Sequence, residues 1–305
     1  MGHVRPTGIR KVSYVQVDKD LNALINLGKV FPFILFHDDL KEYVKGFVNW
    51  HKQTTLEISV VVEGAVNVCI LEQEVTMIAG DAFLIFPGTL HSVTQNPAYS
   101  AARYYTLIFE PELLIGQKGS LFDCEYYSPI IEKGYSFMKF SRDELWTKKV
   151  FEMLDWIYDN YPKDSPAFKL QLQRTVQDIW ILFQNNLFVQ KNISPKYPHT
   201  TKILKLINYI HEHYEEKFSL TDMSEEAHIS RGECCRYFKQ MMNMTISEYL
   251  LEYRISKAMS LLDASSLNIT EIAEATGFGD TSYFIKKFRQ KTTFSPLQYR
   301  AKHLE

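Results

Sequence analysis

The first hundred or so residues carry short apolar runs, whereas the last hundred carry apolar residues at helical spacing. The runs are 31–36, 58–62, 66–71, 83–86 and 104–109, and Gly, Pro and Asn interrupt them. Glu63-Gly64 and Pro87-Gly88 read as turns between strands. Many short strands at close spacing predict a β-barrel or β-sandwich over residues 1–140.

Beyond Arg142 the apolar spacing changes to the helical period. One amphipathic segment precedes Pro162, and a second follows Pro166 with a stripe of Leu172, Val176, Ile179, Phe183 and Leu187. We assign residues 141–190 to a helical connector and the stretch 191–200, which contains two prolines, to a linker. The stripe either covers the barrel or pairs with its copy in a second subunit.

Residues 201–305 contain an internal repeat. Leu220 and Phe238 in the first copy correspond to Ile269 and Phe288 in the second, and helix-capping residues occur at matching places in both. This pattern predicts two helix-turn-helix units, at about 219–241 and 268–291. The helix expected between them, from Ile246 to about Leu262, would span about 25 Å, which can place two recognition helices about one DNA turn apart.

Composition bounds the class of protein. A chain of 305 residues suggests roughly two domains, and 46% hydrophobic with 23% charged residues is typical of a globular protein. The four cysteines lack metal-site spacing, and no segment resembles a signal peptide or a membrane span, so we predict a cytoplasmic protein without membrane contact. The net charge of −2 argues against a uniformly basic nucleic-acid binder, but Lys286, Lys287, Arg289 and Lys291 form a local basic cluster.

In a helix-turn-helix unit, the outward residues of the second helix reach base edges in the major groove. Helical spacing predicts that the inward positions are buried, namely Cys234, Tyr237, Phe238, Tyr283, Phe284 and Phe288. The predicted DNA-binding residues are the outward ones: Arg231, Gly232, Cys235, Arg236, Lys239, Thr281, Ser282, Ile285, Lys286 and Arg289.

The run 269–290, followed by Phe294-Ser-Pro-Leu-Gln-Tyr-Arg300, resembles the signature of the AraC/XylS family of bacterial transcription regulators. The resemblance implies a sequence-specific regulator that binds double-stranded DNA as a homodimer, with RNA polymerase as a further candidate partner. The first copy departs from the family pattern, because His228 stands where the family commonly has Gly and because Gly232 and Glu233 lie in its recognition helix. A Gly inside a helix costs about 1 kcal/mol of propensity.

A second motif lies in the predicted barrel. Residues His51, Gln53, Glu57 and His91 are similar to the motifs of cupin β-barrels, which bind a metal through His, His, Glu and a late His; here Gln53 replaces the second His. In the regulators that the C-terminal resemblance indicates, the barrel holds a small-molecule effector, so we predict no metal, no other cofactor and no enzymatic activity. The candidate effector-binding residues are His51, Glu57, His91, Trp50 and Arg103, and a sugar is one candidate ligand.

The predicted fold class is therefore α+β with two domains: a cupin-like β-barrel with a helical connector, and an all-α tandem helix-turn-helix domain. The leading function is an effector-responsive transcription regulator. A metal-dependent cupin enzyme with a helical appendage is the alternative, since two His and one carboxylate can hold a divalent ion. A third class is a DNA-bending protein without an effector, for which no small molecule would shift the melting temperature.

Overall fold

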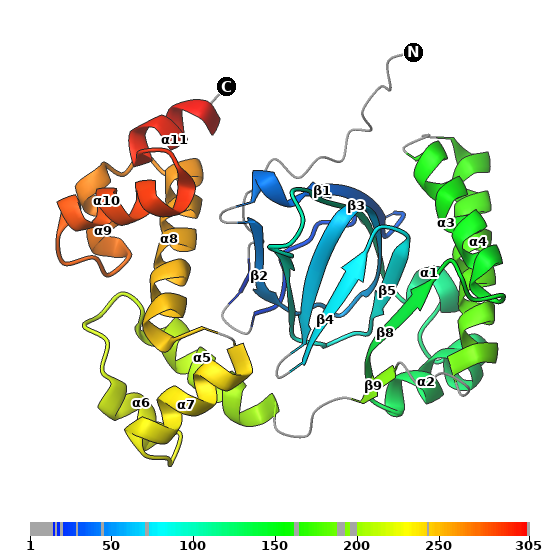
Figure 1. The fold of residues 1–305 in the computed structure, drawn as a ribbon, viewed down its shortest axis with the longest axis horizontal. Coiled ribbons are helices and arrows are strands. Elements are labelled where there is room, and N and C mark those ends of the chain that lie inside the picture. Colours follow the sequence, from blue (N-terminus) through cyan, green and yellow to red (C-terminus); the bar gives the residue numbers. More distant parts are fainter. Residues whose placement is uncertain are drawn as a thin grey trace. The chain divides into compact units, whose positions relative to one another are not determined.

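The structure is a computed structural model that describes residues 15, 17–18, 21–28, 30–43, 46–70, 73–161, 165–187, 193–195, 200–242 and 244–303. The chain divides into two compact units (Figure 1). The first is built mainly from residues 22–70 and 74–196, and the second mainly from residues 197–305.

The first unit is built on antiparallel strands. They are β1 (Phe33–Asp39), β2 (Phe47–His51), β3 (Leu56–Ile70), β4 (Gln73–Ile78), β5 (Asp81–Ile85), β6 (His91–Gln95), β7 (Ala102–Phe109), β8 (Tyr135–Ser141) and β9 (Ile193–Pro195), with a 3-10 turn η1 (Leu40–Glu42) after β1. The main sheet has the order β1-β7-β3-β5-β8-β9, while β6 pairs with both β2 and β3. Within the described residues β1 and β9 stand at opposite ends of this order and are not joined. The strand-rich domain is thus confirmed, but the closed barrel is corrected to an open sheet.

The turn predicted at Glu63-Gly64 is wrong, because both flanking runs belong to the single long strand β3. The register of β3 against β7 shifts between Val61 and Glu63, and β3 then continues to pair with β6 from Val66. Gly64 has a φ of +70°, and a Cβ atom there would overlap the carbonyl oxygen of Ala101. Glycine therefore permits a bend and a close backbone approach, and it lets one strand take part in two pairings.

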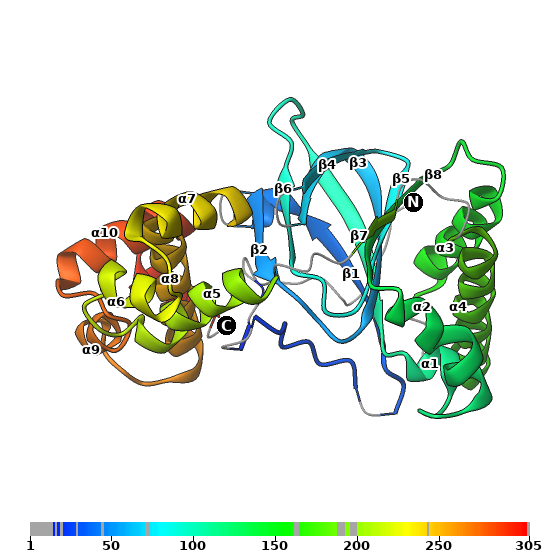
Figure 2. The ribbon, with the colours of Figure 1, turned by 90° about the horizontal axis from the view of Figure 1, so that it is seen from below.

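Helices pack against this sheet in both ribbon views (Figures 1 and 2). They are α1 (Glu112–Ile115), the π-helical turn η3 (Asp123–Tyr127), α2 (Ser128–Glu132), α3 (Thr147–Asn160) and α4 (Pro166–Leu187). Leu172, Val176, Ile179 and Phe183 of α4 are buried in one core with strand residues such as Leu107. Of the two alternatives for this stripe, covering the sheet is the one the structure supports; the side chain of Leu187 lies outside the described residues.

The segment predicted as a linker contains a strand. Ile193–Pro195 forms β9, which pairs antiparallel with β8. This part of the stretch 191–200 is therefore integrated into the sheet, and helix α5 already begins at Thr200. Residues 191–192 and 196–199 of the predicted linker lie outside the described residues.

The second unit is helical. Its helices are α5 (Thr200–His213), α6 (Leu220–Glu226), α7 (Arg231–Met242), α8 (Ile246–Ala264), α9 (Ile269–Ala275), α10 (Thr281–Thr292) and α11 (Pro296–His303). The pairs α6–α7 and α9–α10 are the two helix-turn-helix units, and α8 joins them as the sequence predicts. Within the described ranges, none of the helices combines the length and the hydropathy that a bilayer crossing demands.

Side-chain caps fix where these helices begin. Thr245 and Glu248 form a reciprocal capping box at α8, and Asn268 and Glu271 form another at α9. Asp280 accepts a hydrogen bond from the backbone N–H of Tyr283 at the start of α10. Each cap satisfies backbone N–H groups that lack a partner within the helix, so local sequence alone sets these boundaries.

Candidate functional sites

Helix α7, the second helix of the first helix-turn-helix unit, turns a basic face to solvent. The predicted contact residues Arg231, Gly232, Cys235, Arg236 and Lys239 are all exposed. On the opposite side, Cys234 and Phe238 are fully buried, as the helical spacing predicts. Tyr237 is half-buried rather than buried, with the ammonium group of Lys202 lying 5.4 Å from its ring centroid.

Helix α10 presents the equivalent face in the second helix-turn-helix unit. Ser282, Ile285, Lys286 and Arg289 are exposed, Thr281 is half-buried, and Phe284 and Phe288 are completely buried. The four exposed residues line an open depression of about 620 Å³ together with Gln290. Sequence reasoning missed Gln290, although its position four residues after Lys286 places it beside the same face.

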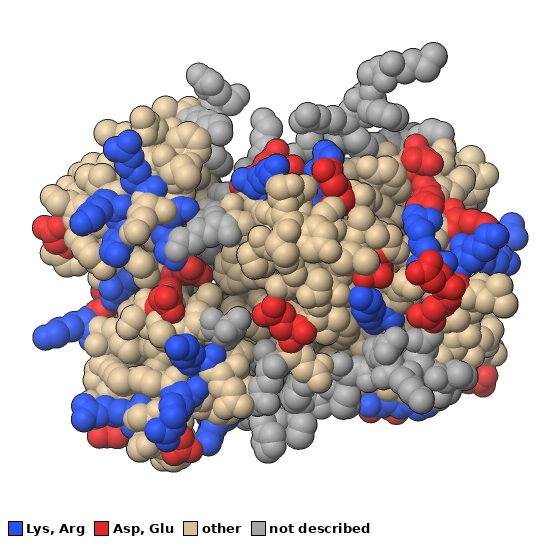
Figure 3. Space-filling view, viewed as in Figure 1, with Lys and Arg blue, Asp and Glu red and all other residues tan. Residues whose placement is uncertain are grey.

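The two faces differ in charge. The sequence of α10 contains no acidic residue, so no carboxylate within the helix offsets Lys286 or Arg289. In α7, Glu233 lies in the first turn, 4.0 Å from the ammonium group of Lys202. Figure 3 shows basic side chains over the helical unit at the left of the view, with acidic groups among them. A local cationic surface therefore exists in a chain whose net charge is −2.

Two sequence predictions about α10 are corrected. Tyr283 was expected in the core but is 50% exposed, with the ammonium group of Lys287 lying 5.5 Å from its ring centroid. Lys291 was counted in the basic cluster but is only 8% exposed and forms an ion pair with Glu252. The ring of Tyr283 stays partly exposed to solvent beside a cation. The charge of Lys291 is neutralised by Glu252 of α8, a contact that the local sequence pattern does not predict.

The adjacent cysteines of α7 have different roles. Burial, with a smaller contribution from Cys235, raises the pKa of the Cys234 thiol to about 11, so this side chain acts as a small apolar core residue. Cys235 is exposed on the outward face and lines a smaller depression with Arg236 and Lys239. Of this pair, only Cys235 is available for contact with a partner.

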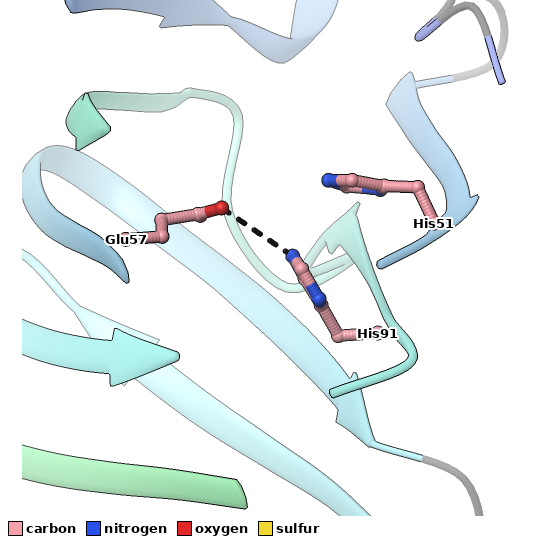
Figure 4. A group of neighbouring side chains, drawn as sticks. All are labelled: His51, Glu57 and His91. Atoms are coloured by element: carbon pink, nitrogen blue, oxygen red, sulfur yellow. Dashed lines mark ion pairs between the residues drawn. The ribbon is translucent and has the colours of Figure 1, made fainter. Parts of the chain in front are cut away.

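In the first unit, three of the predicted effector residues converge. His51 ends β2, Glu57 lies near the start of β3 and His91 begins β6; each is at most 4% exposed. Figure 4 shows these three side chains pointing toward one another, and Nε2 of His91 lies 3.6 Å from Oε2 of Glu57. Strand pairing explains the convergence, because His51 and His91 are direct partners in the β2–β6 register. We name these residues the His-Glu-His cluster.

Hydrogen bonds fix both imidazole rings. Nδ1 of His51 lies 2.8 Å from the carbonyl oxygen of Asn49, and Nδ1 of His91 lies 3.0 Å from that of Thr89. A carbonyl oxygen only accepts, so Nδ1 carries the hydrogen and donates in each ring. The Nε2 atom of His91, which then carries the lone pair of the neutral ring, is directed at Glu57.

The carboxylate of Glu57 is held from two sides. It accepts hydrogen bonds from the Gln53 amide at 2.7 Å and from the Ser59 hydroxyl at 3.1 Å. Ser59 in turn lies 2.9 Å from the hydroxyl of Thr106. All four residues are buried, so these contacts orient a charged group within the domain. The motif position of Gln53 gave the only sequence signal for this support.

The other two predicted effector residues do not join the cluster in the same way. Trp50 is 2% exposed and belongs to the core. Arg103 is exposed and forms an ion pair with Glu63. Glu63 is six residues along β3 from Glu57, a separation of roughly 20 Å in an extended strand. Arg103 therefore lies on the surface, away from the His-Glu-His cluster.

Both units match known family models. Residues 40–121 match the AraC-like ligand binding domain, and residues 223–302 match a helix-turn-helix domain. The first match contains the whole His-Glu-His cluster, and the second contains α7 and α10. The chain thus combines a ligand-binding domain with a DNA-binding domain, which defines a transcription regulator.

Similar proteins carry matching descriptions. An uncharacterized HTH-type transcriptional regulator, YdeC of Bacillus subtilis, is 25% identical over 93% of this chain and 97% of its own length. The HTH-type transcriptional activator RhaR of Escherichia coli O1:K1 is 34% identical over 33% of this chain and 36% of its own length. Among solved structures, the DNA-binding domain of AdpA in complex with a target DNA is 25% identical over 33% of this chain and 92% of that one, with a TM-score of 0.32.

The chain therefore carries the two domains of AraC-type transcriptional regulators.

Proposed function

We propose that this regulator contacts double-stranded DNA through the outward faces of α7 and α10, with α10 as the stronger of the two. The observation that carries this is the face formed by Ser282, Lys286 and Arg289, which is exposed, cationic and free of acidic residues within its helix. Lys and Arg neutralise phosphates and donate to guanine edges, while Ser adapts to either partner. The corresponding candidates on α7 are Arg231, Gly232, Cys235, Arg236 and Lys239.

We further propose that the N-terminal unit binds a small-molecule effector, with the His-Glu-His cluster as its polar anchor and a sugar as one candidate ligand. The effector would shift the population between arrangements that differ in DNA affinity. The regulator would act in the cytoplasm, as a homodimer that contacts RNA polymerase, and without enzymatic activity. Since Leu172 and its neighbours cover the sheet, the dimer contact would use outward apolar residues of α4, among which Leu170 and Ile181 are exposed.

Footprinting and a binding titration test the DNA face. The full chain is titrated against DNA from upstream of its own operon, with Arg289→Ala as the test variant and Lys148→Ala, on α3, as the control that also loses one exposed cation. We expect protection by the wild type, weaker binding by Arg289→Ala and no change for Lys148→Ala. Absence of protection at every effector concentration, or equal affinity of both variants and the wild type, would refute the assigned face.

A thermal-shift screen of sugars and other metabolites tests the effector. A ligand that binds the folded state raises the melting temperature according to its concentration relative to its Kd. We expect such a shift to vanish in Glu57→Gln, which keeps the size of the side chain and removes its charge. Sedimentation of the wild type and of Ile181→Glu tests the dimer, which we expect to dissociate in the variant.

A further inference from the structure

We propose that His51, Glu57 and His91 bind a divalent first-row transition-metal ion, with the amide oxygen of Gln53 as a fourth ligand. The inference goes beyond DNA binding and does not depend on it. It revises the sequence-based prediction of no metal.

The ligand set is compact. One potential ligand atom from each of His51, Glu57 and His91 lies within 4.8 Å of the other two. A metal bound at about 2.1 Å from N and O ligands separates neighbouring ligand atoms by roughly 3.0–3.5 Å. The pair His91 Nε2 and Glu57 Oε2, at 3.6 Å, lies just above this range, and a pair at the 4.8 Å limit would have to close by about 1.3 Å.

Two buried polar atoms at the cluster have no hydrogen-bond partner. They are Nε2 of His91, a residue with 0% exposure, and Oε1 of Gln53, which is 4% exposed. Burying such an atom without a partner is energetically costly, so an unpaired buried atom calls for an explanation. A metal ion accepts the lone pairs of both atoms at once.

The hydrogen bonds around the cluster are those of a metal site. Nδ1 of His51 and of His91 each donate to a backbone carbonyl, which fixes the tautomer that carries a lone pair on Nε2. The Gln53 side chain donates through Nε2 to Glu57, and this orientation leaves its Oε1 as an acceptor. In both histidines the non-ligating Nδ1 is therefore occupied, while Nε2 of His91 and Oε1 of Gln53 have no hydrogen-bond partner.

A polar chain behind Glu57 restrains the carboxylate. Ser59 donates to Glu57 and contacts Thr106, whose hydroxyl lies 3.4 Å from Asp38; Asp38 accepts a hydrogen bond from Tyr43. Every member of this chain is buried. Hydrogen bonds of this kind hold a ligand in place before the ion binds, which raises affinity.

The chemistry of the donors selects the ion. Two imidazoles with a carboxylate and an amide oxygen suit Zn²⁺, Fe²⁺, Co²⁺ or Ni²⁺, whereas Ca²⁺ and Mg²⁺ prefer oxygen ligands alone. Three or four protein ligands leave one or more positions for water or for an oxygen atom of an effector. Because the charge of Glu57 would be balanced by the ion, the burial of this carboxylate gains a physical reason.

Co²⁺ titration of the full chain, purified without a histidine tag and stripped with chelator, tests the site. Absorption bands of Co²⁺ report both binding and coordination geometry. We expect one ion per chain, a loss of affinity of about 100-fold or more in His91→Gln, and a loss of about tenfold in Ser59→Ala, which touches only the support of Glu57. We also expect Gln53→Leu to alter the Co²⁺ bands.

His37→Gln is the matched control. His37 lies in the same unit with a lowered pKa caused by burial and an Nε2 atom without a hydrogen-bond partner, but it is not a member of the cluster. We expect its Co²⁺ affinity to equal that of the wild type, and circular dichroism verifies that each variant is folded. No stoichiometric Co²⁺ in the wild type, or binding that His91→Gln and Glu57→Gln leave unchanged, would overturn the proposal. DNA titration in chelator is a separate readout, so failure here leaves the assigned DNA face intact.

Discussion

The two helix-turn-helix units have the same turn and different residues in it. In the first, the N–H of Ile229 bonds to the carbonyl of Ser224; in the second, the N–H of Phe278 bonds to that of Ala273. Both turns require a left-handed residue, which is His228 with φ +54° in one and Gly277 with φ +73° in the other. A side chain at position 228 is tolerated because that turn is exposed. At position 277 the backbone of Tyr214 and the side chain of Arg254 leave no room.

The two copies share the same turn geometry, but the first copy has residues that fit this turn and a cationic surface less well. The first copy has a strained turn, a glycine in its recognition helix and Glu233 beside its cations. The second has a glycine where the turn needs one and an unopposed cationic face. We therefore expect the second helix-turn-helix unit to supply more of the DNA affinity, and the predictions below test this difference.

The largest effect is expected at Gly277. In Gly277→Val the new side chain would overlap the carbonyl oxygen of Tyr214 and adopt an unfavourable φ, so the free energy of unfolding of the second unit should fall by about 3 kcal/mol or more. All four Trp residues lie at or before position 180, so Trp fluorescence reports on the first unit alone. Far-UV circular dichroism reports on both units, so a circular-dichroism transition that Trp fluorescence does not share is the unfolding of the helical unit. Gly279→Ala, where a Cβ meets nothing within 4 Å, is the control and should melt like the wild type.

The next effect is at Lys291, which occupies the place of Met241 in the first copy. Lys291→Met would leave Glu252, whose side chain is 18% exposed, without its ion-pair partner, and should destabilise the helical unit by about 2 kcal/mol. Lys286→Met changes an exposed lysine of the same helix and should stay within about 0.5 kcal/mol. Thermal melts followed by circular dichroism compare them. Equal melting temperatures would show that the buried pair contributes nothing.

A smaller difference is expected in DNA binding between the exposed arginines of α10 and α7. Arg289→Ala should cost about 1–3 kcal/mol if it reads a base, or reduce the salt slope by about 0.9 if it contacts one phosphate. Arg236→Ala, on the first copy, should cost less. Fluorescence anisotropy at several salt concentrations measures both quantities. A larger loss for Arg236→Ala would reverse the ranking of the two units.

The smallest effect is a gain. His228→Gly removes a side chain from a left-handed position and should stabilise the first helix-turn-helix unit by about 0.5–1 kcal/mol. The gain is small because the relief of backbone strain is partly offset by the greater freedom of glycine in the unfolded chain. The melting temperature of the helical unit should rise slightly, and DNA affinity should stay constant. A fall in stability would mean that His228 makes a favourable contact outweighing its strain.

Local chemistry made the helical unit predictable. The capping boxes at Thr245 and Asn268 and the spacing of Phe284 and Phe288 each act within a few residues, so sequence alone places the helices and their buried faces. The strands were harder, because β3 reads as two runs around Glu63-Gly64 and because β4, with mostly exposed residues, shows no apolar run. A strand of this kind is defined by its partner more than by its own pattern.

Sequence by itself determined the family, the duplicated helical unit and the residue types of the His-Glu-His motif, because all of these depend on spacing along the chain. Only the tertiary structure decided which of these residues meet. Pairing of β2 with β6 brings His51 to His91, the position of Arg103 on β7 separates it from that group, and α8 provides Glu252, the ion-pair partner of the buried Lys291. Contacts between residues far apart in sequence depend on strand register and helix packing, which a local pattern does not encode.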